Sequence, residues 1–396
     1  MTETLPEGWR SVPFWSLFYR DKQIGFPEEE LLSVYREYGV IRKEDRDDNH
    51  NRAGDDLASY QLVEPGDLVL NKMKTWQGAL GISGYRGIVS PAYFVYKSRN
   101  SESSEFLHYA LRSRYYVTQY ASFSKGVRPS QWDLQPEYLS MMRVLLPPLS
   151  TQQSIVKFLA QEIGEIDAML AMLDDLNEAL NSRRASVVER ETIARSGSLT
   201  RLKFCADISL GKTFQGVRKS DHETLVNYVR AASIQPSCLE LDDQRMWMTR
   251  EEQRKYDLRK GDVLVVEGGA GFGRSTYLAE DMLGWGFQNH VIRVRPDRNH
   301  DGRFLNYCVK GHYSSGLIGL LADGATIPGL SSDKAKNLPI PDMSLEEQQC
   351  IADHLDEVTG RIDAMLATID ELKALLVERR AALITDVVTG RKKVPA

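Results

Sequence analysis

The chain has 396 residues, of which 42% are hydrophobic and 27% are charged, and its formal net charge is −5. This hydrophobic content excludes a disordered chain, and the length is enough for two or three domains with their own cores. No window of 18 residues is apolar and uncharged, which excludes a helical membrane span, and the first residues do not form a secretory signal. We therefore expect a cytoplasmic protein.

The cysteines and histidines give no sign of a metal site. The four cysteines never approach CxxC spacing, which argues against a disulfide scaffold or a zinc ribbon. The seven histidines are scattered, and the sequence has neither an HExxH motif nor the Asn/Asp-Pro-Pro-Tyr/Phe motif of methyltransferases. We expect no metal, no other cofactor and no catalytic residue in this chain.

The negative charge is unevenly distributed. Residues 1–146 and 198–338 have net charges of −1 and +3, whereas the shorter segments 147–197 and 339–396 have net charges of −3 and −4. A DNA-binding surface needs local positive charge and not a basic total, so the overall charge does not exclude binding of nucleic acid by the two long segments.

An internal repeat organises the sequence. Residues 149–195 align without gaps to residues 345–391, with 19 identities in 47 positions, and the densest match joins 166–171 to 362–367. The offset of 196 residues is almost half the chain. The sequence therefore predicts two tandem halves, divided into a first domain, a first long helix, a second domain and a second long helix at 1–146, 147–197, 198–338 and 339–396.

Each repeat has the pattern of a long amphipathic helix. Proline-rich steps precede both repeats, and each predicted helix stops near a glycine, at 197 or at 390, as is typical of helix ends. Apolar residues recur every seven positions, which predicts that the two helices pair as a coiled coil, and a second row three positions later includes Met169, Leu176, Met365 and Leu372. Two separate helical hairpins, each packed on its own domain, are the alternative. The residues that we expect to pair the helices are Leu159, Ile166, Leu173, Leu180, Leu355, Ile362, Ile369 and Leu376.

The two long segments contain strand-like runs and glycine turns in the same order. Strand-like runs at 67–70 and 262–266 each follow a glycine, and short helices are predicted to open near Phe106 and Phe304. The remaining sequence differs between the halves. The same order of elements with a different sequence suggests two domains that share a fold and read different targets.

The order of variable segment and helical repeat, occurring twice, resembles the specificity (S) subunit of type I restriction-modification systems. The most specific marks are Ser-Leu-Glu-Glu-Gln-Gln at 344–349, Ile-Asp-Ala-Met-Leu in both helices, Glu-Arg-Arg at 378–380 and Val-Thr-Gly-Arg at 388–391. The opening Leu-Pro-Glu-Gly-Trp at 5–9 also fits that family. The first repeat departs from the pattern, because it has Ser-Thr-Gln-Gln at 150–153.

The resemblance implies an α+β protein in which two mixed α/β target recognition domains are joined by two long helices that pair as an antiparallel coiled coil. Each domain would read one half of an interrupted sequence in double-stranded DNA, and the helices would set the gap. The family also implies that the chain is not itself an enzyme, and that it docks two modification (methyltransferase) subunits and can recruit restriction subunits.

Residues 268–275 invite a second interpretation. Gly-Gly-Ala-Gly-Phe-Gly-Arg-Ser fits a phosphate-binding loop except that arginine replaces the lysine. Such a loop must open a helix, whereas the next residues are strand-like. A glycine hairpin and a loop that faces DNA are the other two interpretations of this segment.

Candidate DNA contacts come from polar and cationic segments next to turns. Lysine suits phosphate, and glutamine or asparagine can read adenine. For each candidate the alternative is an ordinary solvated or core residue. The candidates are Lys72, Lys74 and Gln77; Lys125, Arg128, Ser130 and Gln131; Arg274 and Ser275; and Gln288 and Asn289.

Two other functions remain open at this point. The chain could serve a system in which nuclease and methyltransferase are fused in one partner chain. It could instead be a coiled-coil scaffold that links two β-rich ligand-binding domains, and strong salt dependence of DNA binding would argue against this scaffold.

Overall fold

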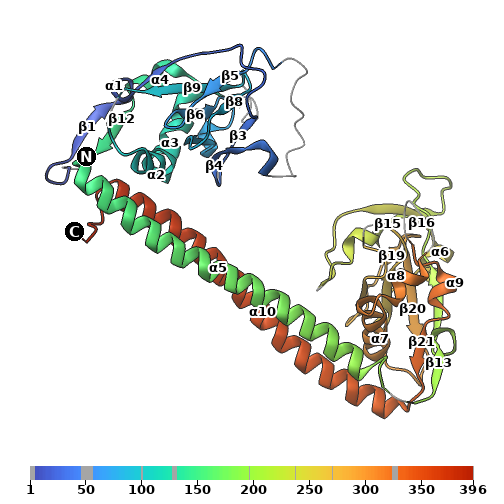
Figure 1. The fold of residues 1–396 in the computed structure, drawn as a ribbon. Helices are drawn as coiled ribbons and strands as arrows, with labels where there is room; N and C mark the ends of the chain where they lie inside the picture. Colours follow the sequence, from blue (N-terminus) through green and yellow to red (C-terminus); the bar gives the residue numbers. More distant parts are fainter. Residues whose placement is uncertain are drawn as a thin grey trace. The chain divides into compact units, whose positions relative to one another are not determined.

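The computed structural model describes residues 5–45, 57–99, 101–126, 132–195, 197–236, 238–269, 271–322 and 329–395. The chain divides into unit 1, which consists of residues 1–173 and 371–396, and unit 2, which consists of residues 174–370. Both long helices contribute residues to both units (Figure 1). No helix in the described ranges combines the length and apolar character needed to cross a membrane.

Short strands and helices make up unit 1 ahead of its long helices. In chain order they are β1 (Arg10–Pro13), α1 (Phe14–Leu17), β2 (Phe18–Arg20), β3 (Leu32–Tyr35), β4 (Gly39–Arg42), η1 (Lys43–Asp45), β5 (Gln61–Val63), β6 (Leu68–Asn71), η2 (Thr75–Gln77), β7 (Leu80–Ile82), β8 (Gly87–Val89), β9 (Tyr93–Ser98), α2 (Ser104–Arg112), α3 (Arg114–Phe123), β10 (Ser124–Lys125), β11 (Asp133–Leu134), α4 (Pro136–Met141) and β12 (Arg143–Leu146).

Unit 2 has a comparable series of elements between its two helical segments. These are β13 (Leu199–Arg201), η4 (Leu202–Phe204), β14 (Ala206–Leu210), β15 (Glu223–Val229), η5 (Ala231–Ser233), β16 (Arg245–Thr249), α6 (Arg250–Lys255), β17 (Val263–Val266), β18 (Ser275–Tyr277), β19 (Trp285–Phe287), β20 (Val291–Pro296), α7 (Gly302–Ser314), α8 (Leu317–Leu321), α9 (Ser332–Ala335) and β21 (Pro339–Pro341). The long helices are α5 (Leu149–Glu191) and α10 (Leu345–Val388).

The two units contain the same four-stranded antiparallel sheet. Its order is β2-β9-β6-β7 in unit 1 and β14-β20-β17-β18 in unit 2. A two-stranded ribbon leads into each long helix, formed by β1 with β12 and by β13 with β21. The halves therefore share a fold although most of their sequence differs, as the spacing of motifs predicted.

The central strands β6 and β17 explain the apolar runs in the sequence. Leu68, Val69 and Leu70 are buried, as are all four residues of β17, so each strand is covered on both faces. A strand buried on both faces loses the polar alternation of a half-exposed strand. The turn before each strand needs the glycine found there, because Gly66 and Gly261 have φ of +91° and +94°.

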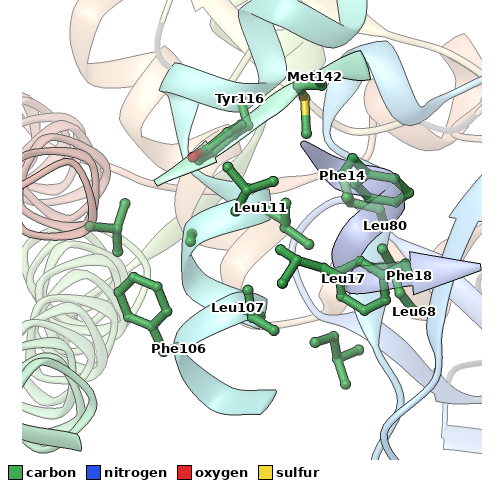
Figure 2. Packing of buried hydrophobic residues seen from close by; sticks show 14 of the residues in the cluster. Phe14, Leu17, Phe18, Leu68, Leu80, Phe106, Leu107, Leu111, Tyr116 and Met142 are labelled. Carbon is green, nitrogen blue, oxygen red and sulfur yellow. The ribbon is translucent and has the colours of Figure 1, made fainter. Parts of the chain in front are cut away.

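The core of unit 1 joins the sheet to its helices and to both long helices. Phe14, Phe18, Leu80 and Phe106 point into this cluster (Figure 2). Members of α5 and α10 complete it, and they include Ile155, Leu159, Leu383 and Val387. Tyr116 is fully buried here, and its hydroxyl accepts the backbone N–H of Leu145 at 2.8 Å. Unit 2 has a corresponding cluster around β17, β20 and α7, which includes residues of α5 and α10.

The long helices run antiparallel where they pack together. In unit 1 Arg380 of α10 forms an ion pair with Asp167 of α5 at 3.0 Å, and in unit 2 Arg184 of α5 pairs with Asp363 of α10. The predicted pairing row is buried or half-buried at all eight positions. The second row of the expected seam is wrong, because Met169, Leu176, Met365 and Leu372 are all exposed. Helix α5 also ends at Glu191, six residues before the glycine expected to stop it.

Candidate nucleic-acid interface

Each four-stranded sheet has one end at which several loops meet. In unit 2, β17 and β14 end there and β18 and β20 begin there, because Val266 pairs with Val291 and Leu210 with Ile292. We call residues 211–212, 267–269, 271–274 and 288–290 the β17 edge. The corresponding β6 edge of unit 1 comprises residues 20–22, 71–77 and 90–92, which flank β2, β6, β7 and β9.

The β17 edge brings together three of the predicted contacts, which come from the segment before β18 and from the segment between β19 and β20. The carbonyl of Arg274 accepts the N–H of Val266 at 2.8 Å, and the N–H of Asn289 donates to the carbonyl of Lys212 at 2.9 Å. Gln288 follows β19 directly, and its N–H donates to Val229 at 2.9 Å. The side chains of Arg274, Gln288 and Asn289 are half-buried, so part of each faces solvent.

At the β17 edge, charged side chains of opposite sign lie close to one another. His290 Nδ1 lies 3.3 Å from Glu267 Oε2, and the buried Lys212 pairs with Glu252 of α6. Two side-chain amides and Arg274 thus stand among paired charges. This composition suits hydrogen bonding to base edges better than binding of phosphate alone.

Ser275 differs from its neighbours because it is only 5% exposed. It is the first residue of β18, and its buried hydroxyl has no hydrogen-bond partner among the residues that the structure describes. A ligand outside the protein cannot reach this hydroxyl unless the hairpin moves.

The glycine-rich segment is a hairpin between β17 and β18, and the residues that follow Arg274 form a strand. Gly269 and Gly273 have φ of +91° and +80°. A Cβ at Gly273 would also lie 2.7 Å from Ile318, so glycine is required there on two grounds. A phosphate-binding loop needs a helix N-terminus at this point, which this hairpin does not provide.

The β6 edge is cationic. Lys72 Nζ donates to the carbonyl of Pro91 at 2.5 Å and lies 4.9 Å from the centre of the Phe94 ring, over which Arg20 also lies at 4.4 Å. Burial lowers the pKa of Lys72, and the nearby charges of Arg20 and Lys22 lower it further. Clustered cations of this kind repel one another, and an anion would relieve the repulsion.

The neighbouring turn presents two more predicted contacts. Asn71 Oδ1 accepts the N–H groups of Met73 and Lys74 at 3.1 and 3.2 Å, which holds the turn. Lys74 is exposed, and with Gln77 it lines a pocket of about 210 Å³ that also includes Asn71 and Tyr93. Trp76 packs against Trp132, with ring centres 5.0 Å apart.

Lys125 is joined to the same region. It lies in β10, opposite Asp133 of β11, and the N–H of the following Leu134 donates to the carbonyl of Lys72 at 3.0 Å. Lys125 Nζ donates to the hydroxyl of Tyr138 at 3.0 Å. Arg128, Ser130 and Gln131 lie outside the described residues.

Several cations at these edges were not among the predicted contacts. Arg20 and Lys22 join the β6 edge because β2 ends there, and Arg218 and Lys219 are exposed on the loop that continues from Lys212. Arg218 lies over the Trp247 ring at 5.7 Å. These cations follow β2 and β14, which occupy the same position in the two sheets. Sequence reasoning missed them because this correspondence could be recognised only once the sheet order was known.

Comparison with known proteins gives a consistent result. Residues 226–374 match the family model described as the type I restriction modification DNA specificity domain. The chain is 22% identical over 409 residues to the type I restriction enzyme StySPI specificity subunit of Salmonella potsdam, covering 93% of this chain and 84% of the relative. It is 29% identical over 100 residues to the EcoBI specificity subunit of Escherichia coli, covering 25% of this chain and 20% of that one.

Two solved structures show the same fold. A chain from a study of complex assembly in a type I restriction-modification system superposes with a TM-score of 0.75 at 16% identity, covering 98% of this chain and 100% of that chain. The HsdS subunit of Thermoanaerobacter tengcongensis superposes with a TM-score of 0.56 at 16% identity, covering 99% of each chain. The shared architecture therefore extends over essentially the whole chain.

Proposed function

Because the chain belongs to the family of type I restriction-modification specificity subunits, we propose that it reads an interrupted, two-part sequence in double-stranded DNA. The observation that carries this proposal is the repeated sheet, whose equivalent ends bear different polar side chains in the two units. One domain reads each half-site, and the two half-sites multiply specificity because the second contact is intramolecular.

We infer that the two edges differ in how many of their contacts go to the DNA backbone and how many go to bases. The β6 edge offers Lys74 and Lys72 close to Arg20 and Lys22, which favours the DNA backbone, with Gln77 placed to reach a base. The β17 edge offers Gln288 and Asn289 at the same end of the sheet as Arg274, which favours contacts to base edges in the major groove. Arg218 and Lys219 supply backbone contacts next to this edge.

The exposed faces of the long helices support docking of partner proteins. Met172 of α5 is 69% exposed, and Leu375 of α10 is 65% exposed, although both helices are otherwise rich in charge. Exposed apolar side chains on a helix surface are typical of protein interfaces. We propose that these faces bind the modification subunits, and that restriction subunits join the resulting complex.

We also propose that the chain itself is non-catalytic and that its partners supply the methyl transfer and the DNA cleavage. In the residues that the structure describes, no group of three or more His, Cys, Asp or Glu is placed to hold a metal ion. The side chains at both edges are donors, acceptors and cations suited to binding. The glycine-rich segment is followed by β18, which pairs antiparallel with β17, and not by the helix that a phosphate-binding loop needs.

The test is methylome sequencing of cells that carry the partner methyltransferase, with and without this chain. We expect an interrupted motif that appears only when the chain is present. A chain in which Gln288 and Asn289 are both replaced by alanine should alter one half of that motif and leave the other half intact. An active methyltransferase whose motif does not depend on this chain would refute the assignment.

A further inference from the structure

A buried glutamine connects α5 to the short helix α2 in unit 1. Gln152 lies in the first turn of α5 and is 0% exposed. Its Oε1 accepts the backbone N–H of Ser103 at 2.9 Å, and its Nε2 donates to the carbonyl of Pro147 at 2.9 Å and to Glu102. Ser103 is the N-cap of α2, so one side chain joins the start of the long helix to the start of a domain helix.

Unit 2 has the same connection at the equivalent residue. Gln348 in the first turn of α10 is 0% exposed. Its Oε1 accepts the backbone N–H of Asp301 at 3.0 Å, and its Nε2 donates to the carbonyl of Met343 at 3.0 Å. Asp301 is the N-cap of α7, whose place in unit 2 corresponds to that of α2 in unit 1.

The neighbouring residues show why these two glutamines matter. Both repeats have a Gln-Gln pair, but the second member, Gln153 or Gln349, is exposed. The buried members lie beside apolar clusters that include Ile155 in unit 1 and Ile351 in unit 2. Apolar contact is non-directional and tolerates small rotations, whereas hydrogen bonds to fixed backbone groups do not.

We propose that Gln152 and Gln348 are positioning residues that hold each recognition domain in one orientation on its long helix, and that they thereby restrict the gap between half-sites. This inference rests on the proposed function. Neither glutamine touches DNA in this scheme. Each acts through the N-cap of a domain helix, and unit 2 adds an ion pair between Arg303 of α7 and Asp353 of α10 at 2.7 Å.

Gap selection requires such rigidity. Adding one base pair to the gap moves the second half-site by about 3.4 Å along the DNA and turns it by about 35°. A domain that can rotate on its helix by a comparable angle accepts both spacings. A domain fixed by directional hydrogen bonds accepts one spacing.

The test compares Gln152→Met and Gln348→Met with Gln153→Met and Gln349→Met as matched controls. Methionine keeps the length of the side chain and removes both hydrogen-bonding groups. The full-length chain, assembled with its methyltransferase subunits, is given DNA libraries in which the gap varies by one base pair. We expect each buried variant to lose at least tenfold of its preference for the native gap, while base preferences within both half-sites stay the same and the controls match the wild type.

A folded, active Gln152→Met or Gln348→Met complex with the native gap preference would overturn this inference. If either methionine variant does not fold, Gln→Glu at the same position serves as a second variant, because it keeps the acceptor for the N-cap N–H and loses only the donor. This variant should keep the native gap preference, and a folded Gln→Glu complex that accepts other gaps would equally overturn the inference. Failure of the proposed function is distinguishable, since the wild-type chain would then yield no interrupted motif at any spacing.

Discussion

His108 of α2 lies with Nε2 2.6 Å from Nη1 of Arg112, one turn further along the same helix. The guanidinium is always protonated and can only donate, so Nε2 is the acceptor and the imidazole is neutral. The ring is packed tightly, because a Cβ at Gly39 would lie 2.9 Å from its Cε1 atom. Burial, followed by the charge of Arg112, lowers the pKa of His108 to about 4.

This pair predicts how the stability of unit 1 depends on pH. The pKa of His108 is about 4 in the folded chain, against an ordinary value of about 6.5 in the unfolded chain. The unfolded chain therefore binds a proton first, and stability falls as the pH is lowered from about 6.5 to about 4. The loss amounts to at most about 3.4 kcal/mol. Thermal unfolding at several pH values should show a smaller decline for His108→Gln than for the wild type.

His222 supplies the control for this experiment, because it lies in unit 2 and its side chain is exposed. His222→Gln should keep the pH dependence of the wild type. If His108→Gln also keeps it, another buried group accounts for the loss of stability in acid.

The repeat and the long helices could be predicted because their signals are periodic. Identities at a constant offset and apolar residues every seven positions depend on local geometry that any long helix shares. The exposed second row could not be predicted, since an apolar residue at a regular spacing looks the same whether it faces the other helix or a separate protein. Met169 and Leu372 are of this kind.

The candidate contacts likewise could be predicted only in part. Arg274, Gln288 and Asn289 were found individually, but their meeting at one sheet end depends on the pairing of β17 with β20, which no local pattern contains. Ser275 looked accessible beside glycines and is buried because β18 begins at that residue. Arg20 was missed because its segment has no turn motif, and only the sheet order brings it to Lys72.

Lys74→Ala and Lys125→Ala test the β6 edge as a contact to the DNA backbone. Each exposed lysine should neutralise one phosphate, so its loss should weaken binding to all sequences and reduce the slope of log K against log salt concentration by about one unit. Binding isotherms of the assembled complex at several salt concentrations measure this slope. Lys157→Ala on α5 removes an exposed lysine from the long helix and should leave the slope unchanged. An unchanged slope for Lys74→Ala or Lys125→Ala would remove that residue from the interface.

Gln288→Ala tests direct reading by the β17 edge. A bidentate contact to one base should be worth about 1–3 kcal/mol of discrimination, so the variant should relax one position of one half-site. Competition between target DNAs that differ at single positions measures the change. Arg274→Ala reports on the same half-site. A loss that is uniform across all positions would mean that the residue positions the domain and does not read sequence.

Leu159→Ala and Met172→Ala test whether the two faces of α5 within unit 1 have different roles, one in folding and the other in binding partners. Leu159 is 0% exposed in the cluster with Leu383 and Val387 of α10, so its truncation leaves a cavity and should lower the free energy of unfolding by about 2–5 kcal/mol. Met172 is 69% exposed, and its truncation should change that free energy by less than about 0.5 kcal/mol. The same Met172 variant should nevertheless bind the modification subunits less tightly, as measured by titration of the purified chain. Equal binding by Met172→Ala and wild type would place the docking surface elsewhere on the helices, whereas a large loss of stability would show that Met172 packs inside the chain.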